Sequence, residues 1–199
     1  MKKTFTQFAI WGLLLTLSVV QSNAQTILVN PTGDGGFETG ATFAANGWTA
    51  VNGAQANAWY VGALGQNGGT NGAYVSNDAG VTNAYNITST AVTHFYRDVT
   101  IPAGQTVLSI AFDFKGVGEL LSGTFYDFIR VSVTPTTVVP VAGTALSTTF
   151  QVGGNFNNVA TFTSGSGGVA VTPGTTVRVV FSWINDSSGG GSAGALDNI

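Results

Sequence analysis

Three segments of this chain alternate apolar and polar residues with a period of two, and this pattern restricts the fold more than any other feature. They span residues 106–115, 127–133 and 176–183. The apolar residues that share one face are Leu108, Ile110, Phe112 and Phe114 in the first segment, Ile129, Val131 and Val133 in the second, and Val177, Val179, Phe181 and Trp183 in the third. Successive side chains of a β-strand point to opposite faces, so each segment predicts a half-buried strand of an antiparallel sheet.

After residue 24 the chain contains shorter strand-like runs and no window with a convincing helical period. Weaker strands are predicted at 26–29, 48–51, 59–61, 73–76, 94–99, 159–162 and 169–171. Turn-forming pairs such as Asn46-Gly47 and Pro173-Gly174 separate these runs. Many short strands at this spacing are typical of a sandwich or barrel. We therefore predict an all-β fold, an antiparallel jelly-roll β-sandwich.

The first 24 residues have the three parts of a secretory signal. Lys2 and Lys3 give a positive start, residues 8–20 are apolar, and Ser22 and Ala24 are small residues at the positions that a signal peptidase reads. We predict a signal peptide at 1–24 and a secreted or cell-surface location. A retained membrane anchor is the alternative, but an anchor needs about 20 apolar residues.

Removal of the signal would leave four basic residues against nine acidic ones, a formal net charge of −5. An acidic chain with scattered cations has no phosphate-binding surface, which argues against nucleic acid as a partner. Binding to anionic membranes is disfavoured for the same reason, and we expect no membrane insertion after cleavage. With no cysteine, the fold must be held by its core or by a metal.

Residues 25–199 are long enough for one good core and short for two, so we predict a single domain. The Gly-rich stretches 62–72, 164–168 and 187–194 are interpreted as loops within it. If one of them were a linker between domains, neither half would hold enough apolar strands. Residues 195–199 resemble an unfinished strand, so we expect a domain truncated at its C-terminal strand and joined to other domains of a longer chain.

Aromatic residues gather between residues 48 and 96, where the loops are rich in Asn and Asp. A sugar ring offers C–H groups to an aromatic face and hydroxyls to polar side chains, so this mixture suits carbohydrate recognition. The interior of a sandwich also needs large side chains, and we assign Trp48 and Trp183 to the core. The candidate ligand-binding residues are Trp59, Tyr60, Tyr74 and Tyr96, with core packing as the alternative.

The sequence offers little for catalysis. Residues 190–194 fit the nucleophile-elbow pattern, but they lie in a glycine-rich stretch that leads into a strand and not into a helix. The single histidine, His94, lies on a predicted strand, where we expect a half-exposed side chain or a ligand contact. Glycoside hydrolysis needs two carboxyl groups at a productive distance, and the sequence shows no such pair. We predict no catalytic residues and no enzymatic activity.

Short motifs near both ends resemble those of galactose-binding-like, jelly-roll carbohydrate-binding modules. Residues 36–38 (Gly-Phe-Glu), followed by 47–49 (Gly-Trp-Thr), are similar to the opening of such modules. Residues 197–199 (Asp-Asn-Ile) resemble their final strand. The stretch 181–186 ahead of 195–199 is also similar to MAM-like adhesin domains of secreted Bacteroidota proteins.

This resemblance implies a structural Ca²⁺ ion where the first and last strands meet. Glu38 and Asp197 match the acidic positions of the motif, and Asp34 is a third candidate ligand by proximity. Calcium takes six to eight oxygen ligands and would fasten the two ends of a cysteine-free sandwich. The alternative is that Glu38 is a surface carboxylate near a turn and that Asp197 is a hydrogen-bonded residue at a strand end.

These observations predict a non-catalytic module that binds extracellular glycans within a larger secreted or surface protein. Two alternatives remain open. One is an adhesion or spacer domain with protein partners. The other is an accessory domain of a secreted hydrolase.

Overall fold

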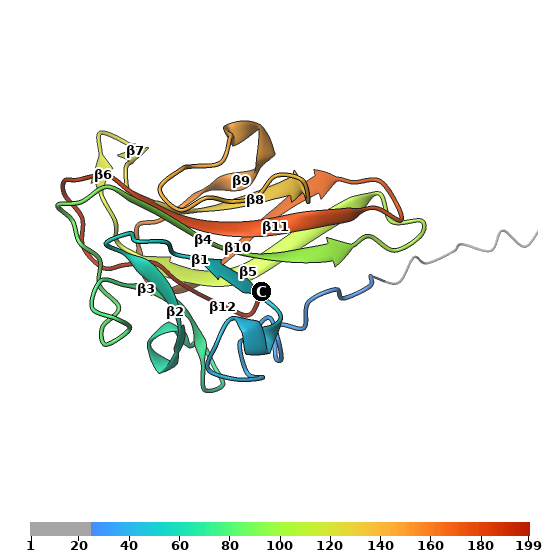
Figure 1. Ribbon diagram of the computed structural model, residues 1–199, viewed down its shortest axis with the longest axis horizontal. Coiled ribbons are helices and arrows are strands. Elements are labelled where there is room, and N and C mark those ends of the chain that lie inside the picture. Colours follow the sequence, from blue (N-terminus) through green and yellow to red (C-terminus); the bar gives the residue numbers. More distant parts are fainter. Residues whose placement is uncertain (1–24) are drawn as a thin grey trace, which may run out of the picture.

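The computed structural model describes residues 25–199, and the predicted signal peptide lies outside these residues. Two five-stranded antiparallel sheets pack face to face (Figure 1). The strand order is β1-β4-β11-β8-β9 in sheet A and β10-β5-β12-β3-β2 in sheet B. A small two-stranded hairpin, β6–β7, lies at one end of the sandwich (Figure 1). The predicted all-β jelly-roll sandwich is confirmed.

The elements have the following bounds. Sheet A contains β1 (Thr49–Val51), β4 (Ala91–Thr100), β8 (Phe128–Pro135), β9 (Gln151–Phe156) and β11 (Thr176–Asn185). Sheet B contains β2 (Ala58–Gly62), β3 (Gly72–Ser76), β5 (Val107–Gly116), β10 (Val159–Ala170) and β12 (Ala195–Asp197). The hairpin is β6 (Leu120–Leu121) with β7 (Thr124–Phe125), and short 3₁₀ turns occupy Ala44–Asn46, Ala63–Gly65 and Thr148–Phe150. Within residues 25–199, no helix is long and apolar enough to cross a membrane.

The three strongly alternating segments form β5, β8 and β11, as predicted. Strand β10 differs from the prediction, because the stretch 164–168 continues the strand and is not a loop. A Cβ atom at Gly165 would lie 2.7 Å from the ring of Phe112, so glycine lets this ring pack directly on the strand. The segment 26–29, predicted as a strand, pairs with no strand, and β9 is an element that the sequence pattern did not predict.

Aromatic rings fill the space between the sheets. Phe95 of β4 stacks on Phe181 of β11 with ring centroids 5.1 Å apart. Trp48 and Trp59 pack edge-on against Phe95 at 5.3 and 5.0 Å. Such pairs contribute about 0.5–1.5 kcal/mol each beyond the burial of apolar area. The core positions predicted for Trp48 and Trp183 are confirmed, since both side chains are buried.

The segment 136–150, here called the β8–β9 loop, crosses the outer face of sheet A. The backbone N–H of Gly143 donates to the carbonyl of Val92 on β4 at 2.7 Å. On the neighbouring strand β11, the guanidinium of Arg178 donates to the loop carbonyl of Val138 at 3.0 Å. The loop is therefore tied to two strands of the sheet that it covers.

His94 is enclosed by this loop. Its Nε2 lies 3.2 Å from the carbonyl oxygens of both Val141 and Thr144. Because both are acceptors, Nε2 carries the proton, and Nδ1 accepts a hydrogen bond from the Ser182 hydroxyl at 2.8 Å. Burial lowers the pKa of His94 and favours this neutral form. The prediction of a half-exposed histidine was wrong, because the loop covers the side chain completely.

Candidate functional site

The outer face of sheet B carries a pair of tyrosines at its β2–β3 edge. Tyr60 and Tyr74 are register partners, and their ring centroids are 6.2 Å apart. The hydroxyl of Tyr74 donates to the carbonyl of Gly80 at 2.7 Å, and burial raises the pKa of Tyr74, so this donor stays protonated. Tyr74 is 5 % exposed, whereas Tyr60 is partly open to solvent. Tyr60 is therefore the accessible ring of the pair, and Tyr74 is its support.

The β3–β4 loop places a carboxylate close to these rings. Asp78 accepts hydrogen bonds from the Ser76 hydroxyl at 2.6 Å and from the hydroxyl and backbone N–H of Thr82. These bonds lower the pKa of Asp78 to about 2, so the carboxylate is ionised at any ordinary pH. Gly80 in the same loop has a φ of +86°, and a Cβ there would lie 3.0 Å from the Tyr60 ring. The loop therefore needs glycine to approach the ring.

An acidic cluster lies on the same face, on the next two strands of sheet B, β12 and β5. Asp113 of β5 and Asp197 of β12 are register partners. The side chain of Asn67 donates to Asp113 at 2.9 Å, and its backbone N–H donates to Asp197. Asn198 and Ser164 also donate to Asp113, at 3.0 and 2.9 Å. The β2–β3 loop, which contains Asn67, thus folds over the two carboxylates.

Asp197 is the member of this cluster whose ionised form is disfavoured by its surroundings. It is fully buried, and burial is the main reason that the pKa of Asp197 rises to about 6. Backbone N–H groups of Asn67 and Asn198 oppose this shift, while the negative charges of Glu38 and Asp113 add to it. The site therefore holds a buried carboxyl group that is surrounded by like charges and amide donors.

Glu38 adjoins the cluster from the N-terminal side. Its carboxylate accepts bonds from the Thr70 hydroxyl at 2.6 Å and from the backbone N–H groups of Thr70 and Asn71 at 2.9 Å. These bonds lower the pKa of Glu38, with the hydroxyl of Thr70 as the largest cause. The negative charge of Glu38 in turn contributes to the raised pKa of Asp197.

The third candidate metal ligand points elsewhere. The carboxylate of Asp34 pairs with Arg97 and also accepts the backbone N–H of Asn30 at 2.7 Å. Among residues 25–199, no three acidic or histidine side chains converge closely enough to hold a metal ion by themselves. Any cation at the cluster would thus need backbone, amide or hydroxyl oxygens beside Glu38 and Asp197.

The other two candidate ligand-binding residues are separated from the tyrosine pair. Trp59 is 1 % exposed, and its indole N–H donates to the carbonyl of Thr93 inside the core at 3.3 Å. Tyr96 lies on β4 of sheet A, with the guanidinium of Arg178 4.1 Å from its ring centroid. The structure therefore brings together Tyr60 and Tyr74 and places Trp59 and Tyr96 in other surroundings.

Several residues of the site were not selected from the sequence. Asp113 had a usable signal, because it lies on the polar face of the alternating segment 106–115. Asn67 and Asn198 had none, since their contacts depend on β12 lying between β3 and β5. In the elbow-like stretch 190–194, the hydroxyl of Ser192 accepts a hydrogen bond from the backbone N–H of Val117 at 3.1 Å. The imidazole of His94 is bound beneath the β8–β9 loop on the other sheet.

No protein-family model matches the chain, and no curated protein sequence matches it. Solved structures share its fold at low identity. The enzymatically active domain of bacteriophage CBA120 tailspike protein 4 aligns with a TM-score of 0.50 and 14% identity, over 85% of this chain and 21% of that chain. TmCBM61 in complex with β-1,4-galactotriose gives 0.49 and 14%, over 85% and 94%. The CBM22-1 xylan-binding domain from Paenibacillus barcinonensis Xyn10C gives 0.46 and 17%, over 81% and 86%. These likenesses concern the fold alone.

Proposed function

We propose that this domain binds extracellular carbohydrate, without catalysis, at the tyrosine pair of sheet B. The observation that carries the proposal is the accessible ring of Tyr60, which is supported by Tyr74 and Gly80. An aromatic face accepts the C–H groups of a sugar, and an ionised carboxylate such as Asp78 accepts its hydroxyls. A shallow surface with one ring and fixed polar groups suits a saccharide better than an apolar ligand.

The charge of this face favours neutral sugars. Asp78 is ionised at ordinary pH, and residues 25–199 carry a net charge of −5. Sulfated or uronic-acid glycans would be repelled, because like charges raise the free energy of the encounter and of the complex. We therefore propose that the ligand class is neutral saccharides.

Sheet A offers a less suitable surface. The guanidinium of Arg178 lies over the ring of Tyr96. Its Nε and Nη2 atoms donate hydrogen bonds to the two carboxylate oxygens of Asp98 at 2.7 and 2.9 Å. The β8–β9 loop covers the neighbouring strand positions, including His94. A sugar would have to displace these contacts before it could reach the sheet.

A glycan array of neutral and anionic saccharides tests the proposal. We expect saturable binding to a neutral saccharide and a loss of at least about tenfold in affinity for Tyr60→Ala, because the stacking ring is removed. The matched control is Tyr126→Ala, since Tyr126 is a 41% exposed tyrosine beside the β6–β7 hairpin. Silence from folded protein would overturn the proposal and favour the adhesion or spacer role.

We further propose that a structural calcium ion binds at Glu38 and Asp197. The supporting observation is that Asp197 is a fully buried carboxyl group whose charged form is disfavoured by burial and by two neighbouring acids. A divalent cation would compensate these charges and fasten β12 to the N-terminal segment. Calcium should raise the melting temperature above its value in chelator, and Asp197→Asn should reduce this response. An unchanged melting temperature would contradict the proposal.

The wider setting is also a proposal. A cleaved signal at 1–24 would place the domain in the secreted or cell-surface fraction, as a module similar to MAM-like adhesin domains of Bacteroidota. N-terminal sequencing of exported material tests it, because mature protein should begin at Gln25. Exported protein that begins at Met1 would contradict signal cleavage.

A further inference from the structure

The β8–β9 loop (136–150) is held on sheet A mainly by polar contacts. Pro140 is the one buried residue of this segment, and Val139 and Val141 are 63% and 59% exposed. Burial of apolar side chains therefore contributes little to the attachment of the loop. Hydrogen bonds fix the loop instead, and the imidazole N–H of His94 serves two of its carbonyls. The attachment thus depends strongly on one side chain.

The seated loop leaves two hydroxyl groups of β8 without hydrogen bonds. Ser132 and Thr134 lie beneath the loop, on the outer face of sheet A, and are 0% and 1% exposed. Among the described residues, neither hydroxyl has a hydrogen-bond partner. A buried hydroxyl that makes no hydrogen bond raises the free energy of the state that buries it. Water would bond both groups in an open state, so the seated and open states are closer in free energy than the bonds of His94 alone indicate.

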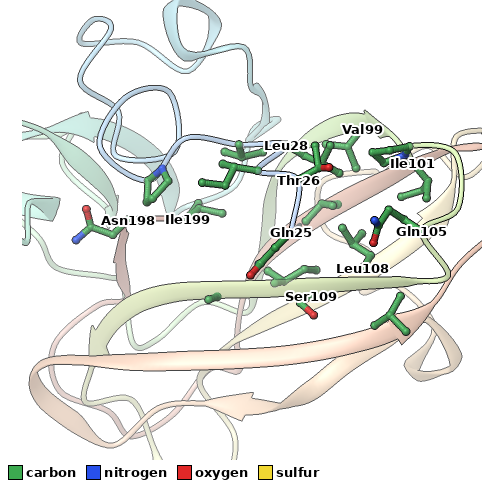
Figure 2. Close-up of a pocket in the computed structure, with 18 of the residues that line it drawn as sticks. Gln25, Thr26, Leu28, Val99, Ile101, Gln105, Leu108, Ser109, Asn198 and Ile199 are labelled. Atoms are coloured by element: carbon green, nitrogen blue, oxygen red, sulfur yellow. The ribbon is translucent and has the colours of Figure 1, made fainter. Parts of the chain in front are cut away.

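A cavity of about 520 Å³ between β5 and the segment 25–31 offers a contrast (Figure 2). The described side chains that line it, such as Leu108 and Gln105, are apolar or uncharged, so their charge does not depend on pH. The space beneath the β8–β9 loop instead contains His94, the single histidine of the chain. Histidine is the side chain whose ordinary pKa lies between pH 5 and 8. A change of pH in this range therefore acts where the loop is attached and not on the lining of the cavity.

Few charged groups face His94. The loop 136–150 contains no ionisable side chain, and neither does β1, which pairs with His94 through Val51. The register partner of His94 on β11 is Ser182, which bonds Nδ1 of the ring. Burial lowers the pKa of His94, the bonds to the loop carbonyls oppose this shift, and no charged group of the described chain contributes to it. The ionisable side chains farther along the same face are Tyr96 and Asp98 on β4, Arg178 on β11 and Arg130 on β8.

We propose that the β8–β9 loop is an acid-released strap, which leaves sheet A when His94 becomes protonated and thereby opens the outer face of this sheet. Protonation turns Nδ1 from an acceptor into a donor, so the hydrogen bond from the Ser182 hydroxyl must reverse or break. The seated loop also disfavours the imidazolium ion, whereas an open loop exposes the ring to water. The open state therefore binds the proton more tightly, and acid shifts the equilibrium towards it below about pH 6.5. The strap lies on the opposite sheet from the tyrosine pair, so the proposal does not depend on carbohydrate binding there.

Amide hydrogen exchange at pH 8 and pH 5 tests the proposal, with rates corrected for the intrinsic effect of pH on exchange. The reporter is the N–H of Gly143, which donates to the carbonyl of Val92 in the seated loop. We expect its protection factor to fall at least about threefold at pH 5, because the protonated ring favours the open state. The amides of β11 should remain at least about 100-fold more protected than Gly143 at both pH values, since the sheet stays folded.

Two variants isolate the contribution of His94. His94→Gln keeps a neutral donor for the loop carbonyls and removes the titration, so the protection of Gly143 should no longer fall at pH 5. Asp197, whose pKa is about 6, is retained in this variant and controls for a second titrating group. Thr134→Val replaces the unpartnered hydroxyl by a methyl group. Gly143 should then be at least about threefold more protected at both pH values, with the fall at pH 5 retained.

Two results would overturn the proposal. One is a protection factor of Gly143 that is the same at pH 8 and pH 5 in the wild type, or that falls equally in His94→Gln. The other is protection in β11 no greater than that of Gly143, which would show that acid unfolds the whole domain and does not release the loop.

Discussion

The outer faces of the two sheets are both polar along their strands, yet a loop encloses the polar pair at the centre of sheet A, whereas part of the face of sheet B stays open. On sheet A, His94 and Ser182 are bonded to each other and fully covered by the β8–β9 loop. On sheet B, Tyr60 and Ser164 stay accessible while they contact Tyr74 and Asp113. Alternation along a strand determines which face a residue joins, whereas a loop distant in sequence determines whether that face meets solvent.

Substitution of His94 should cause the largest loss of stability, because this side chain is enclosed on the outer face of sheet A. His94→Ala leaves the Ser182 hydroxyl and the carbonyls of Val141 and Thr144 without this partner and opens a cavity. We expect a loss of about 2–4 kcal/mol in the free energy of unfolding, measured by urea denaturation. The control on the open face, Lys115→Ala, should cost about 1 kcal/mol or less. Equal losses would remove the distinction between the faces.

The two faces should also respond to pH with opposite signs. Burial raises the pKa of Asp197 from 3.8 to about 6, so its contribution to stability is complete below pH 3.8 and is lost as the pH rises to about 6. Burial lowers the pKa of His94 below 6.5, so its contribution is complete above pH 6.5 and is lost as the pH falls.

The variant Asp197→Asn isolates the contribution of Asp197 to the pH dependence of stability from that of His94. In chelator, the difference in unfolding free energy between the variant and the wild type should grow in the variant's favour from pH 4 to pH 7, by at most about 3 kcal/mol. Urea denaturation at several pH values measures it, and calcium should reduce the difference by stabilising the wild type. A difference that does not change with pH would show that Asp197 has no raised pKa.

The same substitution on each face gives the smallest and most direct comparison. Ser182→Ala leaves Nδ1 of His94 without its donor in a buried site, and we expect a loss of about 1–3 kcal/mol. Ser164→Ala removes an exposed bond to Asp113, and we expect a change within about 0.5 kcal/mol. Thermal unfolding of the two variants side by side measures the contrast. A larger loss of stability in Ser164→Ala than in Ser182→Ala would contradict this prediction.

Much of the fold could be predicted, because β5, β8 and β11 each bury one face and therefore show the period-two pattern. The middle of β10 escaped prediction. Glycine there serves the packing of Phe112, and in isolation a glycine-rich stretch indicates a loop. The burial of His94 also escaped, because it depends on a loop about 50 residues later that bonds to the ring.

The candidate site was less predictable than the fold. Tyr60 and Tyr74 were selected by residue type, and strand pairing then explains why they meet. Trp59 is adjacent to Tyr60, but its side chain points to the opposite face of β2 and enters the core. Asn67 joins the acidic cluster through contacts to β5 and β12, which no local pattern encodes.

The enclosure of His94 has a practical consequence for spectroscopy. It is the single histidine of the chain, so one pair of imidazole resonances reports on one place in the molecule. When the β8–β9 loop is seated, the ring is a neutral tautomer with slow exchange of its Nε2 proton. Brief opening of the loop would let water reach the ring. The exchange rate of the Nε2 proton of His94 would then report the rate of loop opening.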